Sequence, residues 1–162
     1  MLKVDEFINT MREKGLNVTY QRILIYKHLI SKKNHPTADE IYREIIAEYP
    51  SISLATVYKT LETLEEHNLI TKVNALHALA RFDGDTTSHH HLVCLYCKKI
   101  VDVYDKHLEN LPFPSNNGFK VSGYRVQFEG VCEDCTSKSE NQQPKNEITK
   151  VITFCGKETN GN

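Results

Sequence analysis

The cysteines are the residues whose spacing most directly predicts chemistry in this chain of 162 residues. Four of them form two Cys-x-x-Cys pairs, Cys94 with Cys97 and Cys132 with Cys135. A turn of this spacing directs two sulfurs at one ion, so two such turns predict a tetrahedral four-sulfur site, in which Zn²⁺ is the usual metal. A closed site has no open position for a substrate, and the zinc is therefore expected to be structural. The fifth cysteine, Cys155, has no partner at ligand spacing and is interpreted as a free thiol.

A thiol redox enzyme is the alternative for these pairs, because a single Cys-x-x-Cys is also a redox motif. Such motifs are typical of a strand-helix-strand setting, which the pattern around neither pair predicts. Disulfides do not persist in a reducing cytosol. The two pairs together therefore favour structural zinc.

A second group of candidate metal ligands is rich in histidine. His89, His90 and His91 are consecutive, and on a strand His89 and His91 project to one face while His90 points to the other. Asp83 and Asp102 are nearby carboxylates, each at the end of a short apolar run. A mixed imidazole and carboxylate set suits Fe²⁺ or Mn²⁺ as well as Zn²⁺. Spacing alone does not establish that these residues bind one ion, and a solvated polar stretch is the alternative.

A metallohydrolase would use the same histidines and carboxylates. No additional acid or base stands out beside them, so we expect the protein not to be an enzyme.

The elements that must position these residues fall into two regions. In the first region the pattern predicts a helix from Val4 towards Gly15, a second after Thr19, and a third from the Thr37–Glu40 capping box to about Tyr49. A fourth helix is expected from Ser53, followed by strands over residues 69–73 and 79–82.

The fourth helix has two different faces. Its apolar face is expected to carry Leu54, Val57, Leu61 and Leu64, and its other face Ala55, Thr56, Tyr58, Lys59 and Thr63. Short helices followed by a hairpin are the plan of a winged helix-turn-helix, in which this helix would read DNA. A small helical bundle without a nucleic-acid partner is the alternative.

The second region is expected to be a small α/β domain. After a polar hinge over residues 84–88, strands are predicted over 91–94, 100–104 and 119–128, with a short helix near 106–111. The fold class is therefore α+β, with a domain over 1–83, a metal-binding domain over 84–136, and a polar, flexible tail over 137–162 in which 151–154 could add an edge strand.

Composition restricts the class of protein further. The formal net charge is −1, and residues 1–83 hold 11 basic and 11 acidic side chains, so any DNA binding must depend on local basic residues such as Arg22, Lys27 and Lys59. No apolar run reaches the roughly 18 residues of a membrane helix. The first residues also lack the apolar core of a signal peptide, and we therefore expect a cytoplasmic protein without a membrane partner.

Several short motifs occur in an order that resembles one known family. They are Thr19 with Arg22, His35–Glu40, Ser53–Tyr58, Arg81–Asp83, His89–His91 and both cysteine pairs. Together they resemble the ferric uptake regulator (Fur) superfamily of metal-dependent repressors over roughly residues 10 to 136. The resemblance implies a homodimer with an N-terminal winged helix, a C-terminal α/β dimerisation domain, and double-stranded operator DNA as the partner.

The resemblance also implies the ligands of a regulatory metal. They are His35, Asp83, His89, His91 and Asp102. An ion bound by His35 together with ligands of the second domain would fix the two domains in one orientation and so favour DNA binding. The DNA-contacting residues implied are Arg22, Thr56, Tyr58 and Lys59. Asn17 stands where many relatives have a basic residue.

Within that superfamily the chain looks more like the peroxide-stress branch. Asp102 is the shorter carboxylate of that branch, and Gln21 completes its Thr-x-Gln-Arg entry. That branch implies Fe²⁺-catalysed oxidation of two histidine ligands, here His35 and His89, with Mn²⁺ as the alternative regulatory metal. An iron-responsive repressor of iron uptake is the alternative function, and zinc or manganese regulation is a further one.

Many iron regulators have an additional metal site, and this chain lacks some of its expected ligands. Ser88 and Tyr124 stand where histidines are expected, and His90 and Glu109 are the candidate additional ligands.

Overall fold

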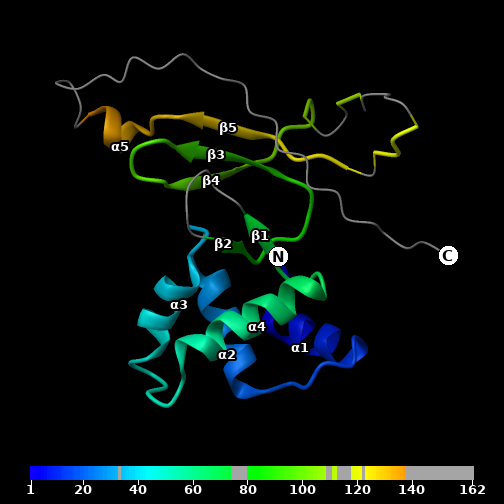
Figure 1. Ribbon diagram of the computed structural model, residues 1–162, viewed down its shortest axis with the longest axis vertical. Coiled ribbons are helices and arrows are strands. Elements are labelled where there is room, and N and C mark those ends of the chain that lie inside the picture. Colours follow the sequence, from blue (N-terminus) through cyan, green and yellow to red (C-terminus); the bar gives the residue numbers. More distant parts are fainter. Residues whose placement is uncertain (33, 74–79, 109–110, 113–117, 122, 138–162) are drawn as a thin grey trace. The chain divides into compact units, whose positions relative to one another are not determined.

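The computed structural model describes residues 1–32, 34–73, 80–108, 111–112, 118–121 and 123–137. The chain divides into two compact units, Met1–Thr87 and Ser88–Asn162 (Figure 1). The first unit holds the helices and a small hairpin, and the second holds a three-stranded sheet. The α+β fold class expected from the sequence is confirmed.

The first unit contains four helices. They are α1 (Val4–Glu13), α2 (Tyr20–Ser31), α3 (Ala38–Ile45) and α4 (Leu54–Glu66). The hydroxyls of Thr19, Thr37 and Ser53 accept hydrogen bonds from backbone N–H groups in the first turns of α2, α3 and α4. These are the starts that the capping pattern predicts. Gly15 has a φ of 70°, a left-handed conformation that glycine adopts without strain just after a helix.

Helix α3 is shorter than the sequence pattern predicts. It ends at Ile45 rather than near Tyr49, and residues 46–48 form turns. The Ile45 carbonyl accepts from the backbone N–H groups of both Glu48 and Tyr49, at 2.9 and 2.8 Å. The chain therefore tightens into a turn that satisfies the last carbonyls of the helix before Pro50.

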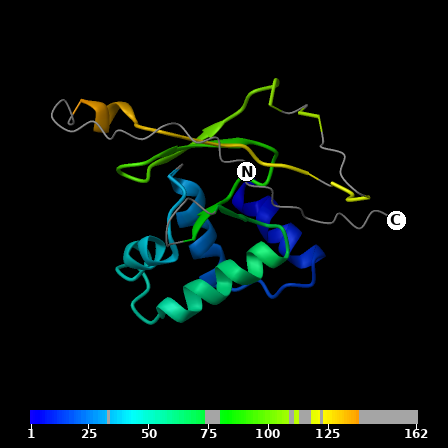
Figure 2. The same cartoon turned by 45° about the horizontal axis from the view of Figure 1, so that its top comes forward.

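The core of the first unit is centred on α2, which packs against the other three helices (Figures 1 and 2). The rings of Phe7 and Tyr26 stack with centroids 3.7 Å apart, and both side chains are fully buried. Val57, Leu61 and Leu64 of α4 are buried as predicted, whereas Leu54 is half-buried.

A two-stranded hairpin completes the first unit. Strand β1 (Thr71–Val73) pairs antiparallel with β2 (Arg81–Asp83), with Thr71 opposite Asp83. Both strands are shorter than predicted, and residues 74–79 lie outside the described residues. Helices followed by this hairpin form the predicted winged helix. No helix in the described part of the chain is long and apolar enough to cross a membrane.

The second unit is built on a sheet with the strand order β4-β3-β5. Its elements are β3 (His90–Cys94), β4 (Ile100–Val103), β5 (Gln127–Gly130) and the short helix α5 (Glu133–Thr136). Strand β3 pairs antiparallel with β4 and parallel with β5.

Strand β5 differs from the prediction of a strand over residues 119–128. It begins at Gln127 and continues to Gly130, because only these residues lie opposite the ladder of β3, from His91 to Cys94. Lys106–Leu108 form a turn where a short helix was predicted, and residues 109–110 lie outside the described residues. The predicted tail beyond Ser137, its edge strand at 151–154 and Cys155 also lie outside them.

Candidate functional site

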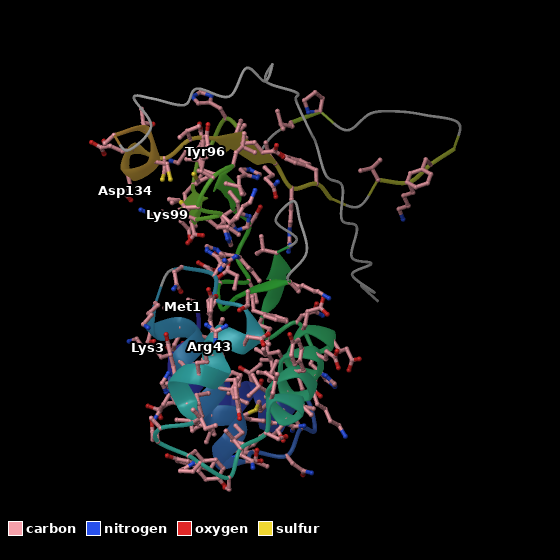
Figure 3. The ribbon with its side chains drawn as sticks, turned by 60° about the vertical axis from the view of Figure 1, so that its left-hand side comes forward. Met1, Lys3, Arg43, Tyr96, Lys99 and Asp134 are labelled. Carbon is pink, nitrogen blue, oxygen red and sulfur yellow. The ribbon has the colours of Figure 1, made fainter. Side chains whose placement is uncertain are left out.

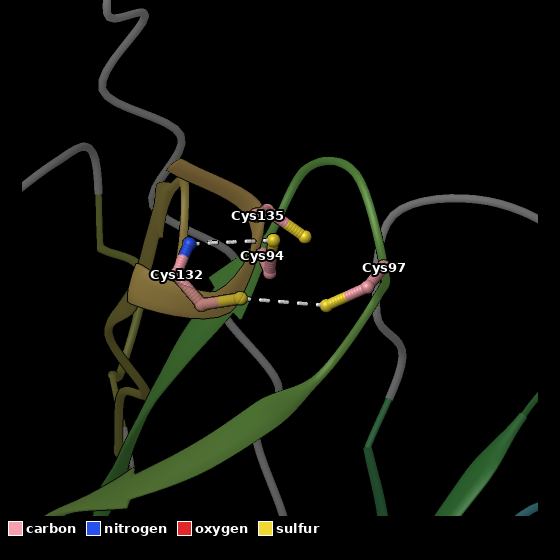
Figure 4. A group of neighbouring side chains, drawn as sticks. All are labelled: Cys94, Cys97, Cys132 and Cys135. Atoms are coloured by element: carbon pink, nitrogen blue, oxygen red, sulfur yellow. Dashed lines mark hydrogen bonds between the residues drawn. The ribbon is translucent and has the colours of Figure 1, made fainter. Parts of the chain in front are cut away.

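The four paired cysteines gather at one end of the sheet in the second unit (Figure 4). Cys94 ends β3, Cys97 lies in the following turn, Cys132 caps α5, and Cys135 lies within α5. Their four sulfurs all lie within 4.8 Å of one another, with Cys97 and Cys132 at 3.6 Å. A tetrahedral Zn²⁺ with bonds of about 2.3 Å separates its sulfurs by about 3.8 Å. The group therefore fits a structural zinc ion.

The backbone around these cysteines forms two tight turns. The Lys98 N–H donates to the Cys94 carbonyl at 3.0 Å, and Lys98 takes a φ of 59° to close that turn. The Cys135 N–H donates to the Cys132 carbonyl at 3.0 Å. Lys99 and Asp134 form an ion pair of 3.2 Å between the two turns (Figure 3).

Two thiols in this group, those of Cys94 and Cys135, have strongly perturbed pKa values. Burial raises the pKa of Cys94, but hydrogen bonds from the N–H groups of Cys132, Cys97 and Tyr96 outweigh burial and lower it to about 6. Hydrogen bonding to Cys132, followed by burial, raises the pKa of Cys135 to about 12. Four thiolates this close repel one another, so a cation is needed to hold all four ionised. This donor set is chemically suited to zinc.

Three further ligands converge within the second unit. His89 Nε2 lies 3.0 Å from His91 Nε2, and Asp102 Oδ1 lies 3.7 and 3.8 Å from these two atoms. His91 and Asp102 are directly opposite on β3 and β4, which places their side chains on the same face. We refer to His89, His91 and Asp102 as the histidine trio. Adjacent ligands of one ion with bonds of about 2.1 Å are separated by about 3 to 3.5 Å. The two histidines lie within this range and Asp102 Oδ1 lies 0.2 to 0.3 Å beyond it, so the trio is close to the geometry that a divalent metal takes.

The first unit contains a second, smaller set. His35 Nε2 lies 3.3 Å from Asp83 Oδ2, and both side chains are buried. Asp83 ends β2, and its other carboxylate oxygen accepts from the Asp85 N–H at 2.8 Å. We refer to His35 and Asp83 as the histidine–aspartate pair. The pair offers one imidazole and one carboxylate, the same donor types as the trio.

His90 points away from the trio, as strand alternation predicts. Its Nδ1 accepts from the Val126 N–H at 3.2 Å, and its ring is parallel to that of Tyr124. The Tyr124 hydroxyl donates to the Leu108 carbonyl and accepts from the Leu111 N–H. Tyr124 thus connects Leu108 and Leu111 to the segment before β5. Of the other residues considered for an additional metal site, Ser88 is exposed and Glu109 lies outside the described residues.

The four candidate DNA-contacting residues have different surroundings. Lys59 is exposed on α4, and the Thr56 hydroxyl bonds that of Ser53 at 2.8 Å. Arg22 donates through Nη1 to the Asn17 carbonyl at 2.7 Å. Tyr58 was expected on the face of α4 opposite the core, but it is half-buried and packs partly against the core. It is adjacent to Val57, at the edge of the buried stripe, and one helical step does not carry it to the opposite face.

Tyr58 also has a partner that the sequence pattern does not indicate. Its hydroxyl donates to Asp39 Oδ2 of α3 at 2.7 Å, and this hydrogen bond raises the pKa of Tyr58. Arg81 is a second residue whose contacts were missed. Its guanidinium donates to the His35 carbonyl at 2.9 Å and to Glu40 Oε2 at 3.2 Å. Its place beside Asp83 in the Arg81–Asp83 motif was the only signal available.

The first unit is a winged helix, a fold typical of DNA-binding proteins. The four-sulfur group and the histidine–carboxylate ligands add candidate metal sites to it, and the class is therefore that of a metal-binding winged-helix protein. The model of the ferric uptake regulator family matches residues 13–129, and the chain belongs to this family. The resemblance to this family that the sequence motifs indicate is thereby confirmed.

Two curated relatives are regulators of the peroxide response. The peroxide operon regulator of Bacillus subtilis (strain 168) is 38% identical over 141 residues, which are 86% of this chain and 97% of the relative. The peroxide-responsive repressor PerR of Staphylococcus aureus (strain Mu50 / ATCC 700699) is 34% identical over 138 residues, which are 84% of this chain and 93% of the relative.

Two solved structures have a similar fold. The ferric uptake regulator Fur of Helicobacter pylori matches with a TM-score of 0.67 and 20% identity, over 83% of this chain and 95% of that chain. The ferric uptake regulator of Vibrio cholerae matches with a TM-score of 0.62 and 25% identity, over 76% of this chain and 98% of that chain.

Proposed function

We propose that the protein is a metal-dependent transcriptional repressor that binds operator DNA as a homodimer and responds to peroxide through Fe²⁺-catalysed oxidation of histidine. The observation that carries the proposal is the histidine trio, with its ligand atoms 3.0 to 3.8 Å apart, in a chain that is 38% identical to a peroxide operon regulator. The protein would act in the cytoplasm and would be a regulator rather than an enzyme.

The regulatory ion would be held by both sets of ligands, His35, Asp83, His89, His91 and Asp102. The trio by itself is a set of two histidines and one carboxylate, which is typical of Fe²⁺ sites that keep open positions. With the histidine–aspartate pair, the chain would supply five donors in all. Peroxide would reach the ion where the protein supplies no donor.

Oxidation would occur at His35 or His89. When bound, Fe²⁺ would activate peroxide next to the imidazole rings. One peroxide oxygen would be transferred to a ring carbon, the ring would lose two electrons, and the second oxygen would leave as water. The altered ring would be a poorer ligand, so the ion that favours the DNA-binding state would be lost.

The four-sulfur group would hold structural zinc and stabilise the second unit. That unit would also form the dimer, because Val101, Leu92 and Phe128 lie side by side across its three strands by register. These residues are 44%, 47% and 38% exposed. A row of exposed apolar side chains on a sheet favours association with a second copy of the chain.

Helix α4 would enter the major groove. Lys59 is exposed and would contact phosphate, together with Arg22 near the start of α2. Thr56 and Tyr58 would contact base edges or the thymine methyl group. This arrangement supplies local positive charge within residues 1–83, whose basic and acidic side chains are equal in number.

Mass spectrometry of the protein before and after a low dose of peroxide tests the proposal. The Fe²⁺-loaded protein should gain about 16 Da, one oxygen, on the peptide that holds His35 or on the one that holds His89, and the Mn²⁺-loaded protein should not gain it. Failure of the Fe²⁺-loaded protein to gain mass would support the alternative, an iron-responsive repressor of iron uptake. Oxidation of Cys94, Cys97, Cys132 and Cys135 with loss of zinc would instead indicate a thiol switch.

A further inference from the structure

The backbone of the loop that presents His35 has a conformation that must be held in place. His35 has a φ of 49°, in the left-handed region that non-glycine residues rarely adopt unless the surroundings fix them. Strand β2 supplies those surroundings. Arg81 Nη1 donates to the His35 carbonyl at 2.9 Å, and the Phe82 N–H donates to the Pro36 carbonyl at 3.0 Å. Thr37 forms an antiparallel bridge with Arg81.

Arg81 connects the same loop to helix α3. Its Nη1 also lies 3.2 Å from Glu40 Oε2, and this carboxylate oxygen accepts from the Thr37 N–H at 2.7 Å. Thr37 and Glu40 form the capping box at the start of α3. The Arg81 side chain is 19% exposed, so the ion pair is partly shielded from water. One guanidinium therefore fixes both the carbonyl of His35 and the first turn of α3.

A hydrogen bond also connects the first turn of α3 to α4. Asp39, the residue before Glu40, accepts the hydroxyl of Tyr58 at 2.7 Å. Asp39 and Glu40 are consecutive residues of one helical turn, so a displacement of Glu40 also displaces Asp39. The hydroxyl of Tyr58 would then lose or change the acceptor that orients it.

We propose that Arg81 is a positioning residue that couples metal binding at His35 to the orientation of Tyr58 on the DNA-reading helix. The route runs from the His35 carbonyl through Arg81 to Glu40, along the first turn of α3 to Asp39, and from there to Tyr58. The inference rests on the proposed function, in which His35 binds the regulatory ion. Coupling between two binding sites is reciprocal, so DNA at Tyr58 tightens metal binding by the same factor.

The test measures this coupling directly. The probe is a DNA duplex selected from a random pool by the Mn²⁺-loaded wild-type protein, and its Kd is measured with and without Mn²⁺. The Kd of Mn²⁺ is measured with and without the duplex, from the electron paramagnetic resonance signal of free Mn²⁺. The coupling ratio is the duplex Kd without Mn²⁺ divided by the duplex Kd with Mn²⁺. This ratio should be lower in Arg81→Met than in the wild type by a factor of about 2 to 30, the range seen for substitutions between coupled sites. The ratio of the two Mn²⁺ Kd values should fall by the same factor.

Further variants locate the route. Asp39→Ala removes the acceptor of Tyr58 and leaves Arg81 intact, so it should lower the ratio as well. The ratio of the double variant should be no lower than that of the single variant with the lower ratio, because both changes interrupt one route. Arg81→Lys keeps the charge but not the planar guanidinium, and it should give a ratio between those of Arg81→Met and the wild type.

Matched controls remove similar groups elsewhere in the first unit. Arg12→Met removes an arginine that bonds Asn9 within α1. Tyr20→Phe removes a tyrosine hydroxyl that bonds Glu48 at 3.0 Å, a tyrosine–carboxylate contact like that of Tyr58. Both controls should keep the wild-type ratio.

Equal weakening of duplex binding with and without Mn²⁺ in Arg81→Met would overturn the proposal, because a merely structural role changes both Kd values alike. If Arg81→Met does not fold, Glu40→Gln and Asp39→Ala carry the test, and unchanged ratios in both would overturn it. A wild-type ratio of one would refute the proposed function and this inference together. A wild-type ratio above one that every variant retains would refute the coupling alone.

Discussion

The four-sulfur group and the histidine–carboxylate ligands differ in how the chain assembles them. Each pair of cysteines lies within one tight turn, and both turns belong to the second unit. The trio instead brings together the residue before β3 with one residue each of β3 and β4, and the histidine–aspartate pair joins residues that are 48 positions apart. Each half of the sulfur site is therefore local, and the sheet brings the two halves together into a closed set of four donors, whereas the trio and the pair each supply too few donors to close a site. A closed site suits stability, and an incomplete one suits a sensor.

The largest expected effect follows removal of one sulfur. Cys132→Ser should lose zinc and unfold the second unit, because structural zinc contributes about 10 kcal/mol or more of apparent binding free energy. Zinc analysis and circular dichroism measure the loss. Cys155→Ser is the matched control and should keep its zinc. A folded Cys132→Ser protein with a native dimer mass would show that zinc does not stabilise this unit.

Removal of a carboxylate from the histidine trio should have a different result. Asp102→Asn should weaken the binding of Mn²⁺ by about 100-fold or more, because an amide is a far poorer ligand than a carboxylate. Zinc content and thermal stability should stay close to those of the wild type. Asp105→Asn is a control outside the trio. A concurrent loss of zinc would mean that the two sites are not independent, and the contrast drawn above would fail.

A single set of ligands and two separate sites can be distinguished by stoichiometry. If the pair and the trio bind one ion, His35→Ala and His89→Ala should both abolish the tight Mn²⁺ site, and the wild type should bind one Mn²⁺ per chain besides zinc. Two Mn²⁺ ions per wild-type chain, with one retained in each variant, would show that the sets act separately.

Changes on α4 should leave both metal sites intact. Lys59→Ala should weaken operator binding and reduce the slope of log Kd against log salt concentration by about one, because one phosphate contact is lost. Gel-shift titration at several salt concentrations measures the slope, and Lys72→Ala on the wing is a comparison for loss of a lysine elsewhere. An unchanged slope would place Lys59 away from phosphate.

The smallest effect is expected at a residue of the core that is in neither metal site. The Tyr26 hydroxyl donates to the Leu2 carbonyl at 2.9 Å, and Tyr26→Phe should lower the free energy of unfolding by about 1 kcal/mol. Burial raises the pKa of Tyr26 to about 12, above the value of about 10 in an unfolded chain. The wild type should therefore lose stability as pH rises from about 10 towards 12, because only its unfolded state ionises there. Tyr26→Phe should lack this part of the pH dependence in denaturant titrations.

The sequence by itself determined the features that depend on neighbours along the chain. The helix starts at Thr19, Thr37 and Ser53 follow from side chains that bond the N–H three residues ahead. The two cysteine turns, and the projection of His89 and His91 to one face, likewise follow from local spacing. The family could also be inferred from the order of these short motifs.

Only the tertiary structure decided the contacts between distant segments. The four residues of β5 and the half-buried place of Tyr58 depend on which partners the rest of the fold provides. The bonds of Arg81 to His35 and Glu40, and of Tyr58 to Asp39, join residues between 19 and 46 positions apart. A side chain's own sequence neighbourhood holds no record of such partners, because they become neighbours only when the core has brought helices and strands together.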